Sequence, residues 1–172
     1  MTDPRLRPEA AGRVGRAALM LGFAGLLPQL ASVGILAVAA VLPADRMWGM
    51  PVAAAGTVAI VYPLLILSFL GGIWWGLAMR RGDGQGRLAA IAVGPSLLAF
   101  LLVALTITSG RPGLSLAAIG SSIATTLLVD RYLVEAGDAP AGWMRLRVPL
   151  SLGLGALTIL AAALVGPAGL PA

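Results

Sequence analysis

The sequence predicts an all-α membrane protein, a polytopic bundle of five transmembrane helices with little soluble mass. Of its 172 residues, 59% are hydrophobic and only 11% are charged, whereas about a quarter of the residues of a soluble domain are charged. The hydrophobic residues occur in five long runs, each near the ~20 residues that a helix needs to cross a bilayer. Short polar segments separate the runs, so we expect a single membrane domain.

This domain is expected to cover residues 17–165. Its predicted helices are residues 17–42, 52–79, 88–108, 113–134 and 148–165. The first two are longer than a bilayer requires, so we expect them to tilt or kink, with Pro28 and Pro63 as natural kink sites. Residues 1–16 are predicted to form a basic tail, and residues 166–172 a short tail on the opposite side.

The distribution of arginine predicts the orientation of the chain. All twelve basic residues are arginines, and ten of them fall on the side that holds the N-terminus, while only Arg46 and Arg111 fall on the other. The positive-inside rule then predicts an inner-membrane protein with a cytoplasmic N-terminus and a periplasmic C-terminus. The first run greatly exceeds the ~7–15 residues of a signal-peptide core, so we expect it to be retained. Whether residues 135–147 form an interfacial helix stays open.

Two absences limit the chemistry of the protein. The chain has no cysteine and no histidine, which excludes disulfides, thiol chemistry and imidazole ligands for haem, copper or zinc. No catalytic triad, zinc-protease motif or phosphate loop is present. We therefore expect no catalytic residue, no metal site, no cofactor and no enzymatic activity. Arginines placed between apolar runs fit membrane lipids as partners better than nucleic acid.

Asp130 is the one acidic residue that falls within a predicted span, and Arg131 follows it. The strong apolar residues of that helix supply about −3 to −5 kcal/mol for insertion, whereas an Asp and an Arg at the bilayer centre would cost about +5 to +7. The pair must therefore lie near the interface or have partners. One interpretation is an ion-pair clamp, and the other is a contact to a lipid headgroup or a substrate. The candidate partners are Arg80, Arg81, Arg145 and Arg147.

Hydroxyl groups gather on the same helix. Residues 120–126 read "GSSIATT" and place Ser and Thr side chains four residues apart. Such groups hydrogen-bond across helices or back to their own helix, and packing is the favoured interpretation over a polar pathway. Gln29 is the only amide well inside a span, so we expect it to bridge to this hydroxyl face.

The second helix contains a glycine motif. Gly72 and Gly76 form a G-x-x-x-G pattern, which permits close approach of another helix, and Gly71 widens the groove. Ser68 precedes these glycines by one turn. We interpret the four residues as a helix-packing or partner contact.

Tryptophans mark one end of the same helix. Trp74 and Trp75 precede Arg80 and Arg81, where an inner-leaflet aromatic belt is expected, and Trp143 would share it. The belt is the favoured interpretation. The alternative is that the tryptophan pair stacks on a ring-bearing ligand such as a quinone.

Two segments, 62–76 and 130–149, resemble a known family. With "ILSFLGGIWWG" in the first, the chain is similar to domain-of-unknown-function family 3429, bacterial inner-membrane proteins related to eukaryotic transmembrane protein 69. The resemblance covers about residues 28–165 and implies a compact multi-helix membrane protein with no catalytic residues to transfer. It points to Ser68, Phe69, Gly71, Gly72, Trp75, Gly76, Asp130, Trp143, Arg145 and Arg147.

Two functions are consistent with these observations. The favoured one is a non-catalytic subunit, scaffold or assembly factor that contacts another membrane protein, or a second copy of itself, through its helices. The alternative is a small carrier or a lipid- or quinone-binding protein. Its candidate polar site would be drawn from Gln29, Trp74, Trp75, Asp130, Arg131, Trp143, Arg145 and Arg147.

Overall fold

The computed structural model describes residues 12–42, 46–47 and 50–165, and it confirms the all-α bundle. The helices are α1 (Arg16–Ala24), α2 (Leu27–Ala39), α3 (Val52–Ala78), α4 (Gln85–Ser109), α5 (Pro112–Glu135) and α6 (Trp143–Val165). Between α2 and α3, the strands β1 (Arg46–Met47) and β2 (Met50–Pro51) pair in antiparallel fashion. The expected tail 166–172 and most of the basic tail lie outside the described residues.

The described residues contain five helical spans that are long and apolar enough to cross a membrane. The first span is made of two helices, because α1 ends at Ala24 and α2 begins at Leu27. Pro28 occupies the first turn of α2, where its missing N–H removes no intrahelical hydrogen bond. The break therefore comes before Pro28. In contrast, α3 continues through Pro63 without interruption.

The last helix begins earlier than the hydrophobic run indicates, at Trp143 rather than residue 148. Residues 136–142 form a loop, so segment 135–147 is not a separate interfacial helix. Gly137 and Gly142 have positive φ angles of 77° and 83°, a conformation in which glycine is favoured because it has no Cβ. This loop turns the chain back, so that the first turns of α6 lie against the last turns of α5.

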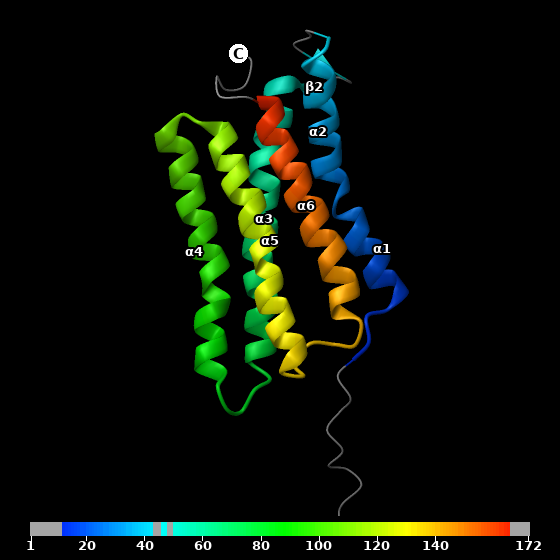
Figure 1. Cartoon of the computed structure of the whole chain (residues 1–172), viewed down its shortest axis with the longest axis vertical. Coiled ribbons are helices and arrows are strands. Elements are labelled where there is room, and N and C mark those ends of the chain that lie inside the picture. Colours follow the sequence, from blue (N-terminus) through cyan, green and yellow to red (C-terminus); the bar gives the residue numbers. More distant parts are fainter. Residues whose placement is uncertain (1–11, 43–45, 48–49, 166–172) are drawn as a thin grey trace, which may run out of the picture.

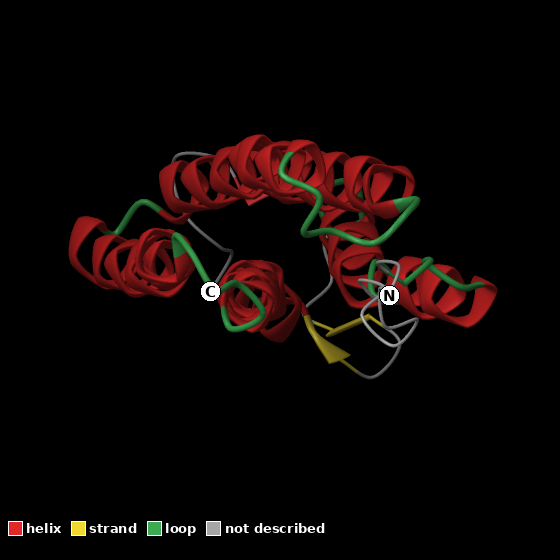
Figure 2. Cartoon of the chain, turned by 90° about the horizontal axis from the view of Figure 1, so that it is seen from below, coloured by secondary structure: helices red, strands yellow, loops and turns green. Residues whose placement is uncertain are grey.

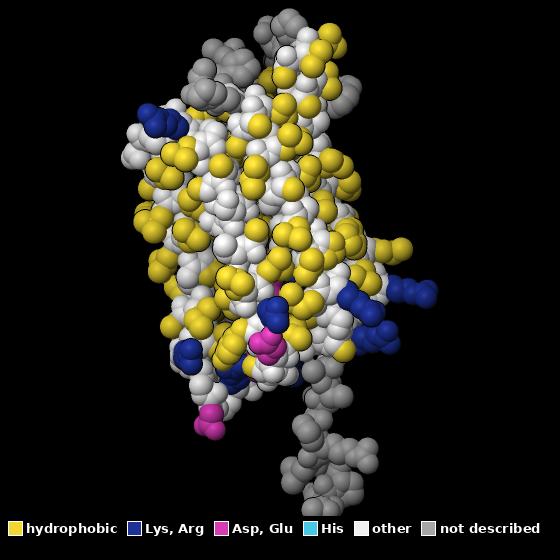
Figure 3. Space-filling view, viewed as in Figure 1, with side chains coloured by type: hydrophobic (Ala, Val, Ile, Leu, Met, Phe, Trp, Pro, Cys, Tyr) yellow, Lys and Arg dark blue, Asp and Glu magenta, His cyan; other side chains and the backbone are white. Residues whose placement is uncertain are grey.

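The helices run roughly parallel to one long axis (Figure 1), and from below they are seen nearly end-on (Figure 2). The start of α1, the α3–α4 connection and the α5–α6 connection share one end of the bundle. Charged side chains gather at that end and leave a broad uncharged band above it (Figure 3). Large hydrophobic side chains such as Leu65, Phe100 and Ile107 are exposed on the outer surface, as expected of a surface that faces lipid.

Glycines set the closest helix contacts. A Cβ on Gly120 of α5 would lie 2.7 Å from the carbonyl oxygen of Gly155 of α6, so these backbones touch. Similarly, a Cβ on Gly71 of α3 would lie 2.4 Å from the carbonyl oxygen of Ala92 of α4. Gly72 and Gly76 make no packing contact within the described chain, because no described atom lies within 4 Å of a Cβ built on either residue. The alternative, that they contact a partner, stays a prediction. The helical phase of α3 turns Gly71 inward and these two outward.

Candidate functional site

A buried carboxylate joins three helices near one end of the bundle. Asp130 lies five residues before the end of α5, about 8 Å along the axis, and is fully buried. Its Oδ2 accepts a hydrogen bond from Nε of Arg147 on α6 at 2.7 Å. Its Oδ1 accepts from the indole N–H of Trp74 on α3 at 3.0 Å and of Trp143 on α6 at 3.1 Å. We call these four residues the Asp130 cluster.

The cluster explains how a charge is kept inside an apolar helix. An unpaired buried carboxylate would be very unfavourable, whereas here an arginine balances the charge and three donors satisfy the oxygens. Arg147 is also buried, and its Nη2 donates to Oγ1 of Thr126 at 3.4 Å. Of the four arginines considered from the sequence, the structure thus brings Arg147 to Asp130. Arg131 instead pairs with Glu135 on the exposed surface, and Arg145 is exposed.

The structure separates the two adjacent tryptophans of α3. Trp74 is 3% exposed and donates to Asp130, so the prediction that it belongs to an interfacial belt is wrong. Trp75 is 45% exposed on the outer surface, where a belt residue would lie. Because consecutive helical residues differ by 100° in direction, only one of them can face the bundle interior. The two therefore do not form a stacking pair for a ring.

A second ion pair lies at the same end of the bundle. Arg81, just after α3, donates through Nε to Oδ1 of Asp138 in the α5–α6 loop at 2.9 Å. Its guanidinium also lies over the ring of Tyr132. The hydrogen bond to Asp138 raises the pKa of Arg81 above its already high ordinary value, so this residue stays charged. The pair holds the loop that positions Trp143 for the Asp130 cluster.

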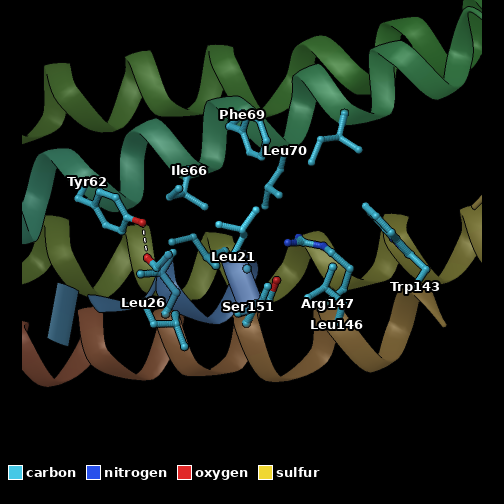
Figure 4. Close-up of a pocket in the computed structure, with 16 residues that line it drawn as sticks. Leu21, Leu26, Tyr62, Ile66, Phe69, Leu70, Trp143, Leu146, Arg147 and Ser151 are labelled. Carbon is cyan, nitrogen blue, oxygen red and sulfur yellow. Dashed lines mark hydrogen bonds between the residues drawn. The ribbon is translucent and has the colours of Figure 1, made fainter. Parts of the chain in front are cut away.

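A pocket of about 350 Å³ lies beside this cluster, between α1, α3, α5 and α6 (Figure 4). Leu21 of α1 and Phe69 of α3 line it, and both are also largely exposed on the outer surface. The pocket therefore opens sideways, between helices, onto the apolar surface of the bundle. We call it the lateral pocket. Its lining residues are Leu21, Gly22, Gly25, Leu26, Tyr62, Ile66, Phe69, Leu70, Ile73, Ile123, Trp143, Leu146, Arg147, Leu150, Ser151 and Leu154.

The polar atoms of the lateral pocket come mainly from one face of α6. Arg147 and Ser151 are four residues apart and lie on adjacent turns, and both point into the pocket (Figure 4). The Oγ atom of Ser151 is buried and has no hydrogen-bond partner among the described residues. On the far side, the Tyr62 hydroxyl donates to the carbonyl oxygen of Gly25, at the break between α1 and α2.

Gln29 lies away from this pocket. It is fully buried, and its Nε2 donates to the carbonyl oxygen of Ala59 and to Oγ1 of Thr158, both at 3.2 Å. The prediction that it bridges to the hydroxyl face of residues 120–126 is therefore wrong, because its partners lie on α3 and α6. The hydroxyls of that face donate to carbonyls of their own helix. This matches the packing interpretation of these hydroxyl groups.

The residues of the predicted glycine contact divide between two surfaces. Oγ of Ser68 lies 2.9 Å from Oγ of Ser96, so it joins α3 to α4. Gly71 packs on the same helix, α4. Gly72 and Gly76 are exposed on the outer surface, where a Cβ would contact no described atom. The structure places none of these four residues in the lateral pocket.

Several lining residues of the pocket were not identified from the sequence. Ser151 and Tyr62 are polar, but each is a single residue in an apolar run, and no spacing pattern distinguishes it from a packing residue. Leu21 and Ile66 carry no chemical signal at all. Three lining residues were identified from the sequence: Arg147 and Trp143 as a charged and an aromatic residue near a span, and Phe69 through the family resemblance.

The five long apolar helical spans of the described residues define a multi-pass α-helical membrane protein. Its chain belongs to a family of proteins of unknown function, DUF3429, which matches residues 14–163. This confirms the resemblance seen in the sequence. Neither a search of curated proteins nor a search of solved structures gave a match.

Proposed function

We propose that this protein binds a lipophilic molecule of the membrane in the lateral pocket. The observation that carries the proposal is the pocket itself, whose volume of about 350 Å³ falls in the range of small-molecule sites. Such sites are mostly apolar with a few placed polar groups, and here Arg147 and Ser151 are those groups. The sideways opening suits a ligand that arrives from the bilayer rather than from water.

Filling the pocket tests this function. Ile66 lines the pocket from α3, whereas its neighbour Leu65 is 62% exposed and lies outside the lining. We expect Ile66→Trp to abolish the co-purification of a bound lipid or quinone in mild detergent, because the larger side chain occupies its place. Leu65→Trp adds the same ring on the outer surface and is the matched control. Mass spectrometry of extracted lipids gives the readout, and equal ligand content in the two variants would contradict the proposal.

A second candidate function is that of a subunit or scaffold within a membrane complex. It is favoured by the outward direction of Gly72 and Gly76, which no described part of the chain covers. Exposed small residues one turn apart permit close contact with another transmembrane helix. This function does not exclude ligand binding, because the glycines and the pocket occupy different positions.

The test of the second function is to obstruct that surface. Gly72→Leu should release a partner, seen as a smaller complex on a native gel of solubilised membranes. Gly94 of α4 is also exposed and also has no atom within 4 Å of a built Cβ. Gly94→Leu is thus the control for adding a leucine to an apolar helix surface. An unchanged complex with Gly72→Leu would count against this function.

A further inference from the structure

The charges around the lateral pocket limit the ligand that it accepts. Among the described residues, Arg147 is the only charged one in the lining, and its charge is balanced by Asp130, 2.7 Å away. An anionic head would have to compete with Asp130 for Arg147 and would be repelled by that carboxylate. A cationic head would be repelled by the guanidinium of Arg147. In a site of low dielectric constant, either arrangement leaves an uncompensated charge, which is strongly unfavourable.

The free hydrogen-bonding atoms limit the ligand further. Nε and Nη2 of Arg147 are engaged by Asp130 and Thr126, whereas Nη1 makes no hydrogen bond to a described residue. One turn further along α6, Oγ of Ser151 is buried without a partner. A serine in a helix ordinarily donates to a carbonyl of the preceding turn, as Ser121 and Ser122 do. Ser151 therefore departs from the pattern of the bundle, and its hydroxyl has no hydrogen-bond partner among the described residues.

We propose that the head of the ligand is neutral and presents a carbonyl oxygen to Nη1 of Arg147 and Oγ of Ser151. Two donors one turn apart suit one strong acceptor, and an acceptor here would relieve the unfavourable burial of an unbonded hydroxyl. The ligand class is thus a neutral carbonyl-bearing lipid, which includes quinones and acylglycerols. This inference rests on the proposed function of the pocket, since it specifies what the pocket binds.

The rest of the lining fits the apolar body of such a lipid. Trp143 borders the space near Arg147 and Phe69 lines the pocket from α3, and both provide flat surfaces (Figure 4). Leucine and isoleucine side chains fill most of the remaining lining. A volume of about 350 Å³ holds a head and a short length of tail, so the remaining tail would leave between α1 and α3 into the bilayer.

The inference can be tested with three probes added to delipidated protein in dodecyl maltoside, which has neither a carbonyl nor a charge. The probes are a benzoquinone with one isoprene unit, dioctanoylglycerol, and dioctanoyl phosphatidic acid, which adds an anionic phosphate to the same two tails. Native mass spectrometry measures the bound fraction. We expect at least one neutral probe to bind about tenfold more tightly than the phosphatidic acid, and the better neutral probe identifies the source of the carbonyl.

Ser151→Ala should weaken binding of that neutral probe by about three- to tenfold, the usual effect of one hydrogen bond. The melting temperature of the Ser151→Ala variant should not fall, because the Ser151 hydroxyl makes no hydrogen bond within the described protein. Ser121→Ala, on the exposed side of α5, is the control and should change nothing.

Each contrary outcome has a distinct meaning. Equal binding of all three probes, with no effect of Ser151→Ala, overturns the neutral-head inference but leaves the proposed function standing. Tighter binding of the phosphatidic acid overturns the inference in favour of an anionic headgroup. No binding of any probe, together with no lipid in the protein as purified from membranes, overturns the proposed function itself.

Discussion

Asp130 is the residue on which the contacts of three helices converge. Its carboxylate accepts hydrogen bonds from Trp74 of α3 and from Trp143 and Arg147 of α6. Because the charge is buried and balanced by one partner, the stability of the bundle depends on both members of the pair. The same pair fixes the guanidinium at the edge of the lateral pocket. A single residue thus links packing to the candidate site.

Asp130→Asn is expected to destabilise the protein by about 3–5 kcal/mol, because it leaves Arg147 buried without a counter-charge. Glu135→Gln is the matched control on the same helix. Its partner Arg131 is exposed, so we expect a change of no more than about 1 kcal/mol. Thermal unfolding in detergent, followed by tryptophan fluorescence, measures both. Similar melting temperatures for the two variants would show that the Asp130 pair is not structural.

At the scale of elements, the bundle is held by close contacts between backbones. The Gly120–Gly155 contact joins α5 to α6, and Gly71 joins α3 to α4. In a bilayer, association of helices gains little from burying apolar surface, because lipid is also apolar. Packing between small residues therefore carries much of the interaction. The side of its helix on which each glycine lies therefore decides which neighbouring helix can approach closely.

Two adjacent glycines of α3 offer an internal comparison. Gly71→Ala would place a methyl group 2.4 Å from a backbone oxygen of α4, which cannot move without shifting the helix, whereas Gly72→Ala meets open space. We expect Gly71→Ala to lower stability by about 1–3 kcal/mol through overpacking, and Gly72→Ala to leave it unchanged or slightly raised. Melting curves by circular dichroism provide the measurement. A larger loss for Gly72→Ala would mean that an additional partner covers Gly72.

At the scale of the whole molecule, charge is distributed unequally between the two ends. The end that holds the start of α1 and the α3–α4 and α5–α6 connections carries most of the arginines of the described chain, while Arg111 precedes α5 at the opposite end. The positive-inside rule favours placing the arginine-rich end in the cytoplasm. The lateral pocket and the Asp130 cluster would then lie in the inner leaflet.

Labelling of single cysteines tests this orientation, and the chain has no native cysteine to interfere. Asp83→Cys lies in the α3–α4 connection. Ser109→Cys lies at the last residue of α4, just before the α4–α5 connection at the opposite end of the bundle. With a membrane-impermeant maleimide, we expect Ser109→Cys to react in spheroplasts and Asp83→Cys only in inverted vesicles. The reverse pattern would place the pocket in the outer leaflet.

The amino-acid sequence by itself determined the number of spans, because the bilayer requires runs of a minimum length. It also indicated that Asp130 needs a partner, because a lone charge within a span is too unfavourable. It placed the last helix five residues too late, since the amphipathic start of α6, with Trp143 and Arg147, does not look like a hydrophobic run.

Only the tertiary structure decided which arginine meets Asp130, which glycine faces a neighbour, where Gln29 donates, and that Ser151 opens into a pocket. The physical reason is the nature of a membrane helix. A soluble helix marks its buried face with an apolar stripe, whereas a membrane helix is apolar all round and leaves its rotation unmarked. Partners and pockets depend on that rotation and on the register between helices distant in sequence, and these are settled only when the helices pack.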